Sequence, residues 1–209
     1  MKKDRVANPV IGRLPRYYRC VEELYLVGCV RVSSATLSQR LGFTASQIRQ
    51  DFSNFGEFGQ QGYGYNVQFL YDEIGKILGQ THMNHVILVG VGNLGQAIAN
   101  YVRFEKLSFK MIGLFDIDPS KKGKEVSGIK IQMVDELEDF IKTHQVDIAA
   151  LTIPKESAEP IARKLTELGV KALWNFAHVD LDVPEGVIVE NVHLSDSLMT
   201  LSYNITKMK

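Results

Sequence analysis

The fold is decided by His85-Val86-Ile87-Leu88-Val89-Gly90-Val91-Gly92-Asn93-Leu94-Gly95, an apolar run that passes directly into a glycine-rich turn. A second apolar run, residues 109–115, leads to Asp116, 21 positions after Gly95. A strand, a Gly-x-Gly-x-x-Gly turn, a helix, a strand and a terminal acid form the arrangement that a dinucleotide requires. The stretch therefore predicts a βαβ unit with a nucleotide at its turn.

The residues of this turn have separate expected tasks. Gly90 permits the tight turn, Gly92 lets the backbone approach the pyrophosphate, and Gly95 allows the helix to pack against the strand. The helix dipole and the first backbone amides face the phosphates. The amides expected to do so are those of Val91, Gly92, Asn93 and Leu94.

Asp116 is expected to accept hydrogen bonds from the ribose hydroxyls of the adenosine. Asp118 follows it and no arginine stands beside the two, so a 2′-phosphate would be repelled and NAD is favoured over NADP. The nearby lysines Lys121 and Lys122 weaken this argument against NADP. NAD(H) is therefore the expected cofactor.

Strand-like and helix-like stretches alternate from His82 onward, which predicts an α/β fold with a doubly wound parallel sheet. Buried strands are expected at residues 85–89, 109–115, 146–153, 171–174 and 187–189, and helices at 94–104, 135–144 and 157–168.

Two later strand ends are expected to complete the pocket, because ligands lie at the carboxyl ends of parallel strands. They are Thr152-Ile153-Pro154 and Asn175-Phe176-Ala177. Thr152 would bond to cofactor oxygens and Phe176 would lie beside the ring. Ordinary loop closure explains these residues equally well.

The first eighty residues have a different character. A helix is predicted to start at Pro15, a second to run from Ser34 to Leu41 before Gly42, and a third to start at a capping box formed by Thr44 and Gln47. Two short helices joined by a glycine turn are typical of a helix-turn-helix, although a three-helix packing module fits the same pattern. The apolar side of the third helix carries Ala45, Ile48, Phe52 and Phe55. Its free side carries Ser46, Gln47, Arg49, Gln50 and Ser53.

Residues on that free side suit DNA. Arg49 matches guanine or phosphate, and Gln47 and Gln50 match adenine. Residues 55–65 alternate aromatics with glycines around a tip that holds Gln60 and Gln61, which predicts a β-hairpin. A hairpin after a recognition helix is a wing that contacts the DNA backbone or minor groove, although a plain surface hairpin has the same pattern.

Composition narrows the class of protein. Residues 1–78 carry ten Lys/Arg against seven Asp/Glu, and residues 79–209 carry fourteen against seventeen. Cys20 and Cys29 form no metal or redox spacing, and the five histidines form no cluster with carboxylates. No apolar run spans a membrane, and no signal peptide is recognisable. We expect a cytoplasmic protein without a metal site, and not an enzyme.

A narrow apolar stripe lies at the chain end, where Leu194, Leu198, Leu201 and Ile205 repeat at intervals of four, three and four. The stripe predicts a helix that packs on a partner subunit. A helix that folds back on its own sheet is the alternative.

Six motifs stand in one order along the chain: Arg19-Cys20-Val21-Glu22-Glu23-Leu24, Phe55-Gly56-Glu57-Phe58-Gly59, Gly62-Tyr63-Gly64-Tyr65, Gly90–Gly95, Phe115-Asp116-Ile117-Asp118-Pro119 and Asn175-Phe176-Ala177. By these motifs the chain closely resembles the Rex family of redox-sensing transcriptional repressors. The resemblance implies a homodimer with an N-terminal winged helix at residues 1–79, a Rossmann domain for NAD(H) at 80–192 and a domain-swapped C-terminal helix at 193–209. It also implies binding to operator double-stranded DNA and release when NADH replaces NAD⁺.

The chain departs from the family pattern at several positions. Gln50, Gln60 and Gln61 stand where basic residues are usual, which implies fewer phosphate contacts. His178 replaces a typical proline. His193 replaces an aspartate that, in the family, makes a redox-dependent contact with an arginine and a tyrosine at the positions of Arg19 and Tyr101.

Two other functions fit parts of the sequence. A small NAD(P)-dependent oxidoreductase would use the same nucleotide unit, with the first domain mediating oligomerisation. A regulator that binds another nucleotide, such as a coenzyme A derivative, would share both domains.

Overall fold

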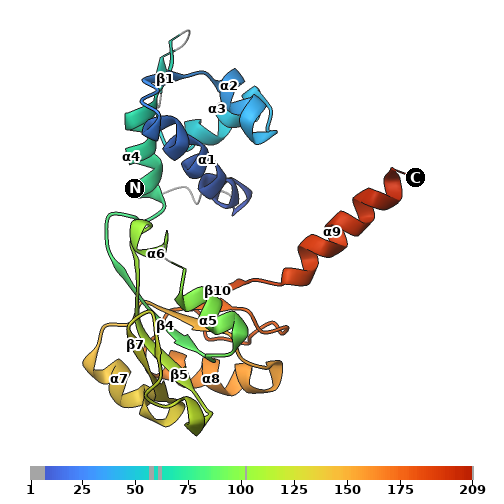
Figure 1. Ribbon diagram of the computed structural model, residues 1–209. Coiled ribbons are helices and arrows are strands. Elements are labelled where there is room, and N and C mark those ends of the chain that lie inside the picture. The colour runs from blue at the N-terminus through green and yellow to red at the C-terminus, as the bar shows by residue number, and fades with distance from the viewer. Residues whose placement is uncertain (1–7, 57–58, 61–62, 102, 209) are drawn as a thin grey trace. The chain divides into compact units, whose positions relative to one another are not determined.

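A computed structural model describes residues 8–56, 59–60, 63–101 and 103–208 (Figure 1). The chain divides into two units, Met1–His82 and Met83–Lys209. The boundaries predicted from the sequence, after residues 79 and 192, stay a prediction.

Unit 1 contains four helices and a small antiparallel sheet among its described residues. The sheet has the order β1-β3-β2, and β3 pairs with both of its neighbours. Buried side chains from three helices, such as Tyr17, Ile48 and Leu70, form its core. The elements are α1 (Asn8–Leu26), β1 (Arg31–Val32), α2 (Ser34–Leu41), α3 (Ala45–Ser53), β2 (Gly59–Gln60), β3 (Gly64–Asn66) and α4 (Val67–Ile77).

Helix α1 starts earlier than predicted, at Asn8 and not at Pro15. Leu14 is fully buried, so the apolar face extends upstream of the proline, while Pro15 itself lies on the exposed side. Burial of that face outweighs the backbone hydrogen bond that the proline cannot donate.

The capping residues explain the limits of α2 and α3. The Ser33 side chain accepts from the Thr36 amide, and Gly42 ends α2 with a φ of 74°. The Thr44 side chain accepts from the Gln47 amide, as predicted. The reciprocal half of the capping box is absent, because the Gln47 side chain bonds to Asp51 instead.

Unit 2 is built on a seven-stranded sheet with the order β10-β9-β8-β4-β5-β7-β6. Every neighbouring pair is parallel except β6 with β7. The strands are β4 (Asn84–Val89), β5 (Phe109–Asp116), β6 (Glu125–Val126), β7 (Ile129–Met133), β8 (Ile148–Leu151), β9 (Ala172–Asn175) and β10 (Ile188–Asn191). The helices are α5 (Asn93–Ala99), α6 (Arg103–Lys106), η1 (Pro119–Lys121), η2 (Val134–Glu136), α7 (Leu137–Thr143), α8 (Lys155–Glu167) and α9 (Leu194–Lys207).

This order confirms the predicted doubly wound parallel sheet. After β4 the chain first adds β5, β6 and β7 on one side of that strand and then adds β8, β9 and β10 on the other side. The sequence missed β6 and β7, and it joined α5 and α6 into one helix over 94–104. The Asn100 side chain ends α5 by donating to the Gln96 carbonyl and accepting from Ser127. A sequence pattern that counts only apolar spacing does not detect this interruption.

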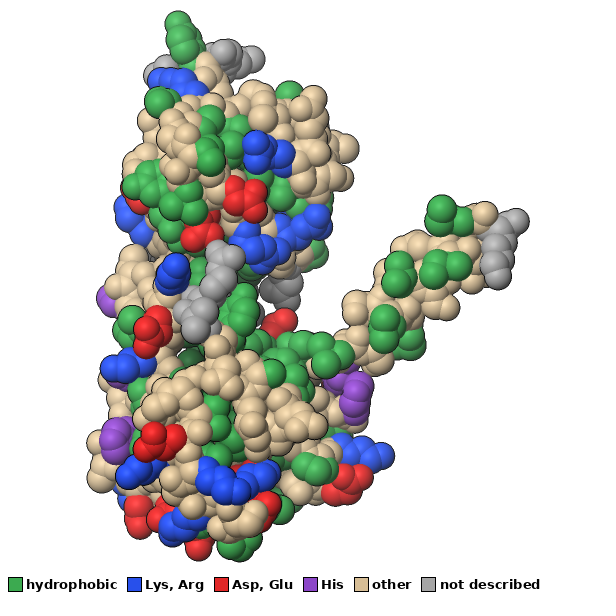
Figure 2. All heavy atoms as spheres, in the orientation of Figure 1, with side chains coloured by type: hydrophobic (Ala, Val, Ile, Leu, Met, Phe, Trp, Pro, Cys, Tyr) green, Lys and Arg blue, Asp and Glu red, His purple; other side chains and the backbone are tan. Residues whose placement is uncertain are grey.

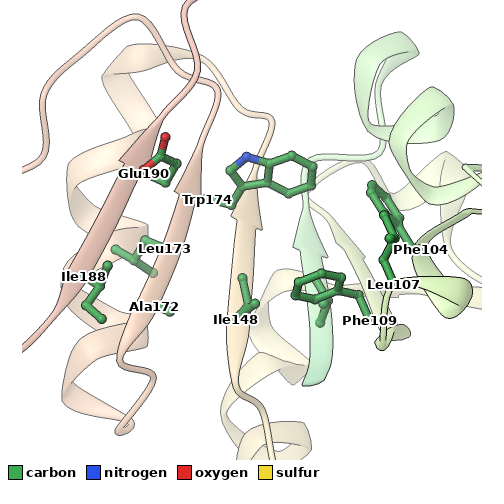
Figure 3. A pocket seen from close by; sticks show the side chains of 10 residues that line it. Phe104, Leu107, Phe109, Ile148, Ala172, Leu173, Trp174, Ile188 and Glu190 are labelled. Atoms are coloured by element: carbon green, nitrogen blue, oxygen red, sulfur yellow. The ribbon is translucent and has the colours of Figure 1, made fainter. Parts of the chain in front are cut away.

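The two faces of the sheet are covered unequally. Alternate residues of β4 belong to different clusters: Ile87 packs with residues of α7 and α8, and Leu88 packs with residues of α5. On the second face an apolar cavity of about 310 Å³ remains (Figure 3). It is lined by Val86, Phe104, Leu107, Phe109, Ile148, Ala172, Leu173, Trp174, Ile188 and Glu190.

Helix α9 buries none of its own residues. The four residues of its predicted stripe are between 51% and 67% exposed, and Figure 2 shows hydrophobic side chains along this helix. The structure therefore does not place α9 back on its own sheet, which was the alternative left open by the sequence.

Close packing at Gly95 yields a first prediction. A Cβ there would lie 2.1 Å from the Gly90 carbonyl oxygen, whereas a Cβ at Gly92 would meet nothing within 4 Å. Gly95→Ala should lower the unfolding free energy of unit 2 by about 1–3 kcal/mol. Gly92→Ala, the matched control, should change it by less than about 0.5 kcal/mol. Fluorescence of Trp174, the single tryptophan, reports unfolding of unit 2 in denaturant. Equal stability of the two variants would contradict the prediction.

Candidate nucleotide pocket and recognition helix

The glycine turn after β4 is held close to the end of β8. Gly90 has a φ of +99°, and a Cβ on it would lie 2.5 Å from the Thr152 carbonyl oxygen. Gly92 and Asn93 are exposed at the start of α5. The turn is therefore crowded on its protein side and open at the helix N-terminus, as a phosphate contact requires.

A cavity of about 430 Å³ lies at the carboxyl ends of the central strands. It brings together Gly90 and Gly92 with Asp116, Thr152 and Pro154, all predicted from the sequence. Val91 is buried in the core, and Asn175 and Phe176 do not line this cavity. The other residues that line it are Val89, Ile117, Lys121, Val134, Ile153, Glu156, Ser157, Pro160 and Ile161.

Asp116 ties the glycine turn to the end of β5. One carboxylate oxygen accepts from the Val91 amide at 2.7 Å and from Lys121 Nζ at 2.8 Å, and the other accepts from the Asp118 amide at 2.9 Å. Burial raises the pKa of Asp116, but these hydrogen bonds outweigh burial and leave the pKa below its ordinary value. A ribose hydroxyl that bonds to this carboxylate has to share it with Lys121. The sequence pattern did not identify Lys121 as a partner of Asp116.

Thr152, which follows β8, and Asn175, which ends β9, use their side chains in hydrogen bonds within the protein. The Thr152 hydroxyl donates to the Gly90 carbonyl at 2.6 Å. The Asn175 amide is fully buried, donates to the Val179 carbonyl at 2.7 Å and to Asn191 at 2.9 Å, and accepts from the Ala177 amide. The Asn175 side chain therefore closes its own loop, and its predicted place in the cofactor site stays a prediction. Phe176 packs edge-on against Trp174, with ring centroids 4.6 Å apart.

Helix α3 exposes most of the residues predicted to contact DNA. Ser46, Arg49, Gln50 and Ser53 are exposed. Arg49 donates to the Ser34 hydroxyl at 3.0 Å, which links the start of α2 to α3. Gln47 is half-buried. The side chains of Gln60 and Gln61 lie outside the described residues.

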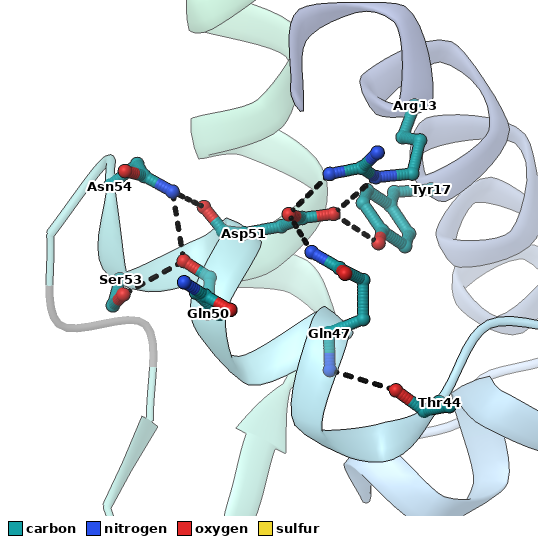
Figure 4. A network of polar contacts seen from close by, with 8 residues as sticks. All are labelled: Arg13, Tyr17, Thr44, Gln47, Gln50, Asp51, Ser53 and Asn54. Atoms are coloured by element: carbon teal, nitrogen blue, oxygen red, sulfur yellow. Dashed lines mark hydrogen bonds and ion pairs between the residues drawn. The ribbon is translucent and has the colours of Figure 1, made fainter. Parts of the chain in front are cut away.

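A buried carboxylate connects α3 to α1 (Figure 4). Asp51 is fully buried and accepts from both Arg13 Nε at 2.6 Å and Arg13 Nη2 at 2.7 Å. It also accepts from the Tyr17 hydroxyl at 2.6 Å and from Gln47 Nε2 at 2.8 Å. Burial raises the pKa of Asp51, but these bonds outweigh it and leave the pKa below the ordinary value. Asp51 is a charged residue among the apolar positions of α3, and this is the signal by which the sequence could have revealed the network.

The three predicted switch residues are divided between the two units, and their contact stays a prediction. Arg19 is an exposed residue of unit 1, and Tyr101, half exposed, packs edge-on against Phe104 in unit 2. His193 stacks on His178, with ring centroids 5.4 Å apart. Within the described residues, His193 Nδ1 is buried without a hydrogen-bond partner.

The described ranges contain neither a metal-binding cluster nor a helix that could span a membrane. No group of three His, Cys, Asp or Glu residues there is arranged to hold a metal ion. In the same ranges no helix has the length and apolar character needed to cross a membrane.

Two family models match separate parts of the chain. A model described as a CoA binding domain matches residues 81–179, and a model described as the N-terminus of a putative DNA-binding protein matches residues 5–53. The first covers the glycine turn and every strand of the sheet except β10, and the second covers α1 to α3.

Curated proteins and solved structures match nearly the whole chain. The redox-sensing transcriptional repressor Rex of Caldicellulosiruptor saccharolyticus is 54% identical over 99% of this chain and 94% of its own length. That of Clostridium tetani is 52% identical over 97% of this chain and 96% of its own.

The crystal structure of RSP with NAD⁺ and operator DNA has 52% identity and a TM-score of 0.92, and it covers 97% of this chain and 94% of RSP. The structure of RSP with NADH has 48% identity and a TM-score of 0.91, over 98% and 96%.

The hydrogen bonds to Asp116 predict how its contribution depends on pH. Because its pKa is lowered in the folded state, its stabilising effect is present at neutral pH and is lost as the pH falls below the ordinary value of 3.8. Asp116→Asn should be less stable than wild type by about 1–2 kcal/mol at pH 7. The difference should stay constant down to pH 5 and shrink below pH 4, as measured by Trp174 fluorescence in denaturant. A difference that grows in acid would contradict this assignment.

Proposed function

The chain belongs to the Rex family of redox-sensing transcriptional repressors, and from that premise we propose how its two units carry out repression. Unit 1 binds operator DNA, unit 2 binds NAD⁺ or NADH, and NADH releases the DNA. The observation that carries this proposal is the similarity, over 97% of the chain, to a repressor crystallised with NAD⁺ and operator DNA. The chain is a repressor and not the oxidoreductase that its nucleotide unit alone would allow.

The cavity at the strand ends takes the dinucleotide in this proposal. The amides of Gly92, Asn93 and Leu94 face the pyrophosphate at the helix N-terminus, whereas the amide of Val91, also predicted to do so, donates to Asp116. Asp116 bonds the ribose, and Thr152 and Pro154 lie along the cofactor. Phe176 lies at the end of β9, beside β8, where Leu151 pairs with Asn175. It therefore reaches the same edge of the sheet, and Asn175 positions it.

The charge of the nicotinamide ring provides the redox selectivity. The oxidised ring is cationic and costly to bury, whereas the reduced ring is neutral. Ile153 and Phe176 offer apolar surface to it. A hundredfold tighter binding of NADH by the DNA-free state shifts the equilibrium by about 2.7 kcal/mol.

Helix α3 enters the major groove in this proposal. Its exposed face supports the assignment, because four predicted contact residues are available there while Ile48 and Phe52 are buried. The wing brings Gln60 and Gln61 to the backbone or minor groove. The proposed contacts are those of Ser46, Gln47, Arg49, Gln50, Ser53, Gln60 and Gln61.

We further propose a homodimer in which α9 of each subunit packs on its partner. Two unpaired apolar surfaces support this: the stripe on α9 and the cavity that Trp174 and Phe104 line on the less covered face of the sheet. A twofold dimer would also present two recognition helices to two half-sites about 34 Å apart. Residues Arg19, Tyr101 and His193 would meet in that assembly.

A regulator of another nucleotide is the second candidate, because the model that matches residues 81–179 is described as a CoA binding domain. Competition of coenzyme A derivatives against NADH separates the two. Displacement of NADH at micromolar concentration would favour the second candidate.

Operator retardation with each cofactor tests the proposed function. NADH should release a bound promoter fragment, and NAD⁺ at equal concentration should not. Asp116→Ala should bind DNA but lose the response to NADH, since the ribose contact is gone. Arg49→Ala should bind NADH normally and DNA weakly. Equal release by both cofactors, or no retardation at all, would overturn the proposal.

Helix α9 provides the test of the dimer. Leu198→Lys places a charge in the apolar stripe and should give a monomer in light scattering with at least tenfold weaker operator binding. Thr200→Lys, an exposed change away from the stripe, is the control and should remain dimeric. If Leu198→Lys also stays dimeric, α9 is not the dimer contact.

A further inference from the structure

The peptide between Gly90 and Val91, directly after β4, is hydrogen-bonded on both of its sides by side chains. Its carbonyl oxygen accepts from the Thr152 hydroxyl at 2.6 Å. Its amide donates to a carboxylate oxygen of Asp116 at 2.7 Å. Because the carbonyl and the amide of a trans peptide point in opposite directions, the two side chains approach it from opposite edges. We call this arrangement the peptide clamp.

The order of the strands explains why the clamp forms at this point. Strand β4 lies between β8 and β5, Thr152 directly follows β8, and Asp116 ends β5. The preceding peptide is bonded to the same two neighbours through backbone groups. Its carbonyl, that of Val89, accepts from the Thr152 amide at 2.9 Å, and its amide, that of Gly90, donates to the β5 backbone at 2.8 Å. The clamp therefore joins the same strand ends by side chains, one peptide further along.

The proton of the Thr152 hydroxyl is already committed. The hydroxyl carries one proton and a carbonyl oxygen only accepts, so this proton lies toward Gly90 and is not available to a phosphate oxygen. The same hydroxyl lies beside the buried Gly95, where a Cβ would come within 2.9 Å of it. Any effect of Thr152 on a phosphate therefore passes through the turn and not through donation by the hydroxyl.

Beyond the clamp, the carbonyls of the turn accept hydrogen bonds and its residues are exposed. The carbonyls of Val91 and Gly92 accept from Gln96, through its side chain at 3.3 Å and its backbone amide at 2.9 Å. Within the described residues, the backbone amides of Gly92, Asn93 and Leu94 make no hydrogen bond, because they precede the first intrahelical donor of α5. An anionic group at this end of α5 therefore meets donors.

The clamped peptide has little restraint from its own glycines. Gly90 has a φ of +99°, and glycine adopts φ values of either sign at little cost, so the peptide can rotate unless other bonds hold it. Such a rotation would displace the amides that follow. We propose that Thr152 and Asp116 are positioning residues for the pyrophosphate, which hold this peptide so that the amides of the next three residues point at phosphate oxygens. The inference rests on the proposed function, since it requires a dinucleotide at the turn.

Hydrogen exchange tests the clamp on the free protein. Thr152→Val keeps the shape of the side chain but removes the hydroxyl, which bonds to the Gly90 carbonyl and not to the Val91 amide. The Val91 amide should nevertheless exchange about threefold to tenfold faster, relative to the Leu88 amide within β4, because one hydrogen bond that holds the peptide is lost. NMR of isotope-labelled protein measures both amides. An unchanged ratio would show that the peptide is held without Thr152 and would overturn the inference.

Three ligands distinguish positioning from direct contact: NADH, ADP, which lacks the nicotinamide half, and adenosine, which lacks the phosphates. Thr152→Val should weaken NADH and ADP by the same factor, roughly threefold to tenfold, and adenosine by less than about twofold. NAD⁺ should be weakened as much as NADH, because both carry the same pyrophosphate. Equal weakening of all three ligands would indicate a contact with the adenosine, and weakening of NADH alone a contact with the nicotinamide half. Either result would overturn the inference, and if adenosine binds too weakly to titrate, the exchange of Val91 decides.

Two further threonine variants are the controls. Thr152→Ser retains the hydroxyl and should restore the affinities and the exchange of Val91. Thr166→Val is the matched control, because the Thr166 hydroxyl also donates to a backbone carbonyl, that of Arg163 at 2.8 Å, but lies on α8 outside the cavity at the strand ends. It should leave all affinities unchanged. If wild type binds no NADH, the proposed function fails; if wild type binds NADH and Thr152→Val binds NADH and ADP equally well, only the inference fails.

A double-mutant cycle tests whether the two side chains hold the same peptide. Once Asp116→Asn has weakened one side of the clamp, Thr152→Val should cost less ADP affinity than it does in wild type. The ribose contact of Asp116 is absent from both halves of this comparison and cancels. Losses that multiply as independent effects would show that the two residues act separately and would overturn their joint role.

Discussion

The nucleotide unit depends on one close approach, that of helix α5 to the turn that precedes it. At Gly95 even a methyl group would overlap the Gly90 carbonyl oxygen, and at Gly90 it would overlap the end of β8. Only residues without a Cβ allow β4, β8 and α5 to converge there. The convergence places exposed amides of α5 beside a cavity of about 430 Å³ at the strand ends. The position of the proposed cofactor therefore follows from backbone packing before any side chain contributes.

Each unit has one buried carboxylate that holds a segment assigned to function. Asp116 holds the glycine turn of unit 2, and Asp51 holds α3 of unit 1. Asp116 accepts from the glycine turn and from Lys121, and Asp51 accepts from Arg13, Tyr17 and Gln47. In both cases hydrogen bonds outweigh the cost of burial and keep the pKa low, so the groups are charged at neutral pH. A charged acceptor accepts several donors at once and never donates. Such a group fixes both the position and the hydrogen-bonding polarity of its neighbours.

A single subunit leaves apolar surface uncovered. The face of the sheet with Trp174 is covered mainly by the short helix α5, and α9 buries no residue of its own. Contiguous exposed apolar surface often marks a site of contact with another protein. The proposed pairing of α9 with a second subunit would cover both surfaces, and it would make the arrangement of the DNA-binding units depend on the state of the nucleotide units.

The sequence by itself determined the five parallel strands β4, β5, β8, β9 and β10, the glycine turn with Asp116, and the two-helix arrangement with its exposed residues, but it missed β6, β7 and the break between α5 and α6. Those features follow from local patterns of apolar spacing, glycine and capping residues. It did not reveal Lys121 as the partner of Asp116 or the contact of Gln47 with Asp51, and it left open whether Asn175 closes the β9 turn. Only the tertiary structure decided these contacts, because each side chain has several polar groups within reach. Segments distant in the chain, such as the one that brings Arg13 to Asp51 or Val91 to Asp116, decide which of those groups it bonds to.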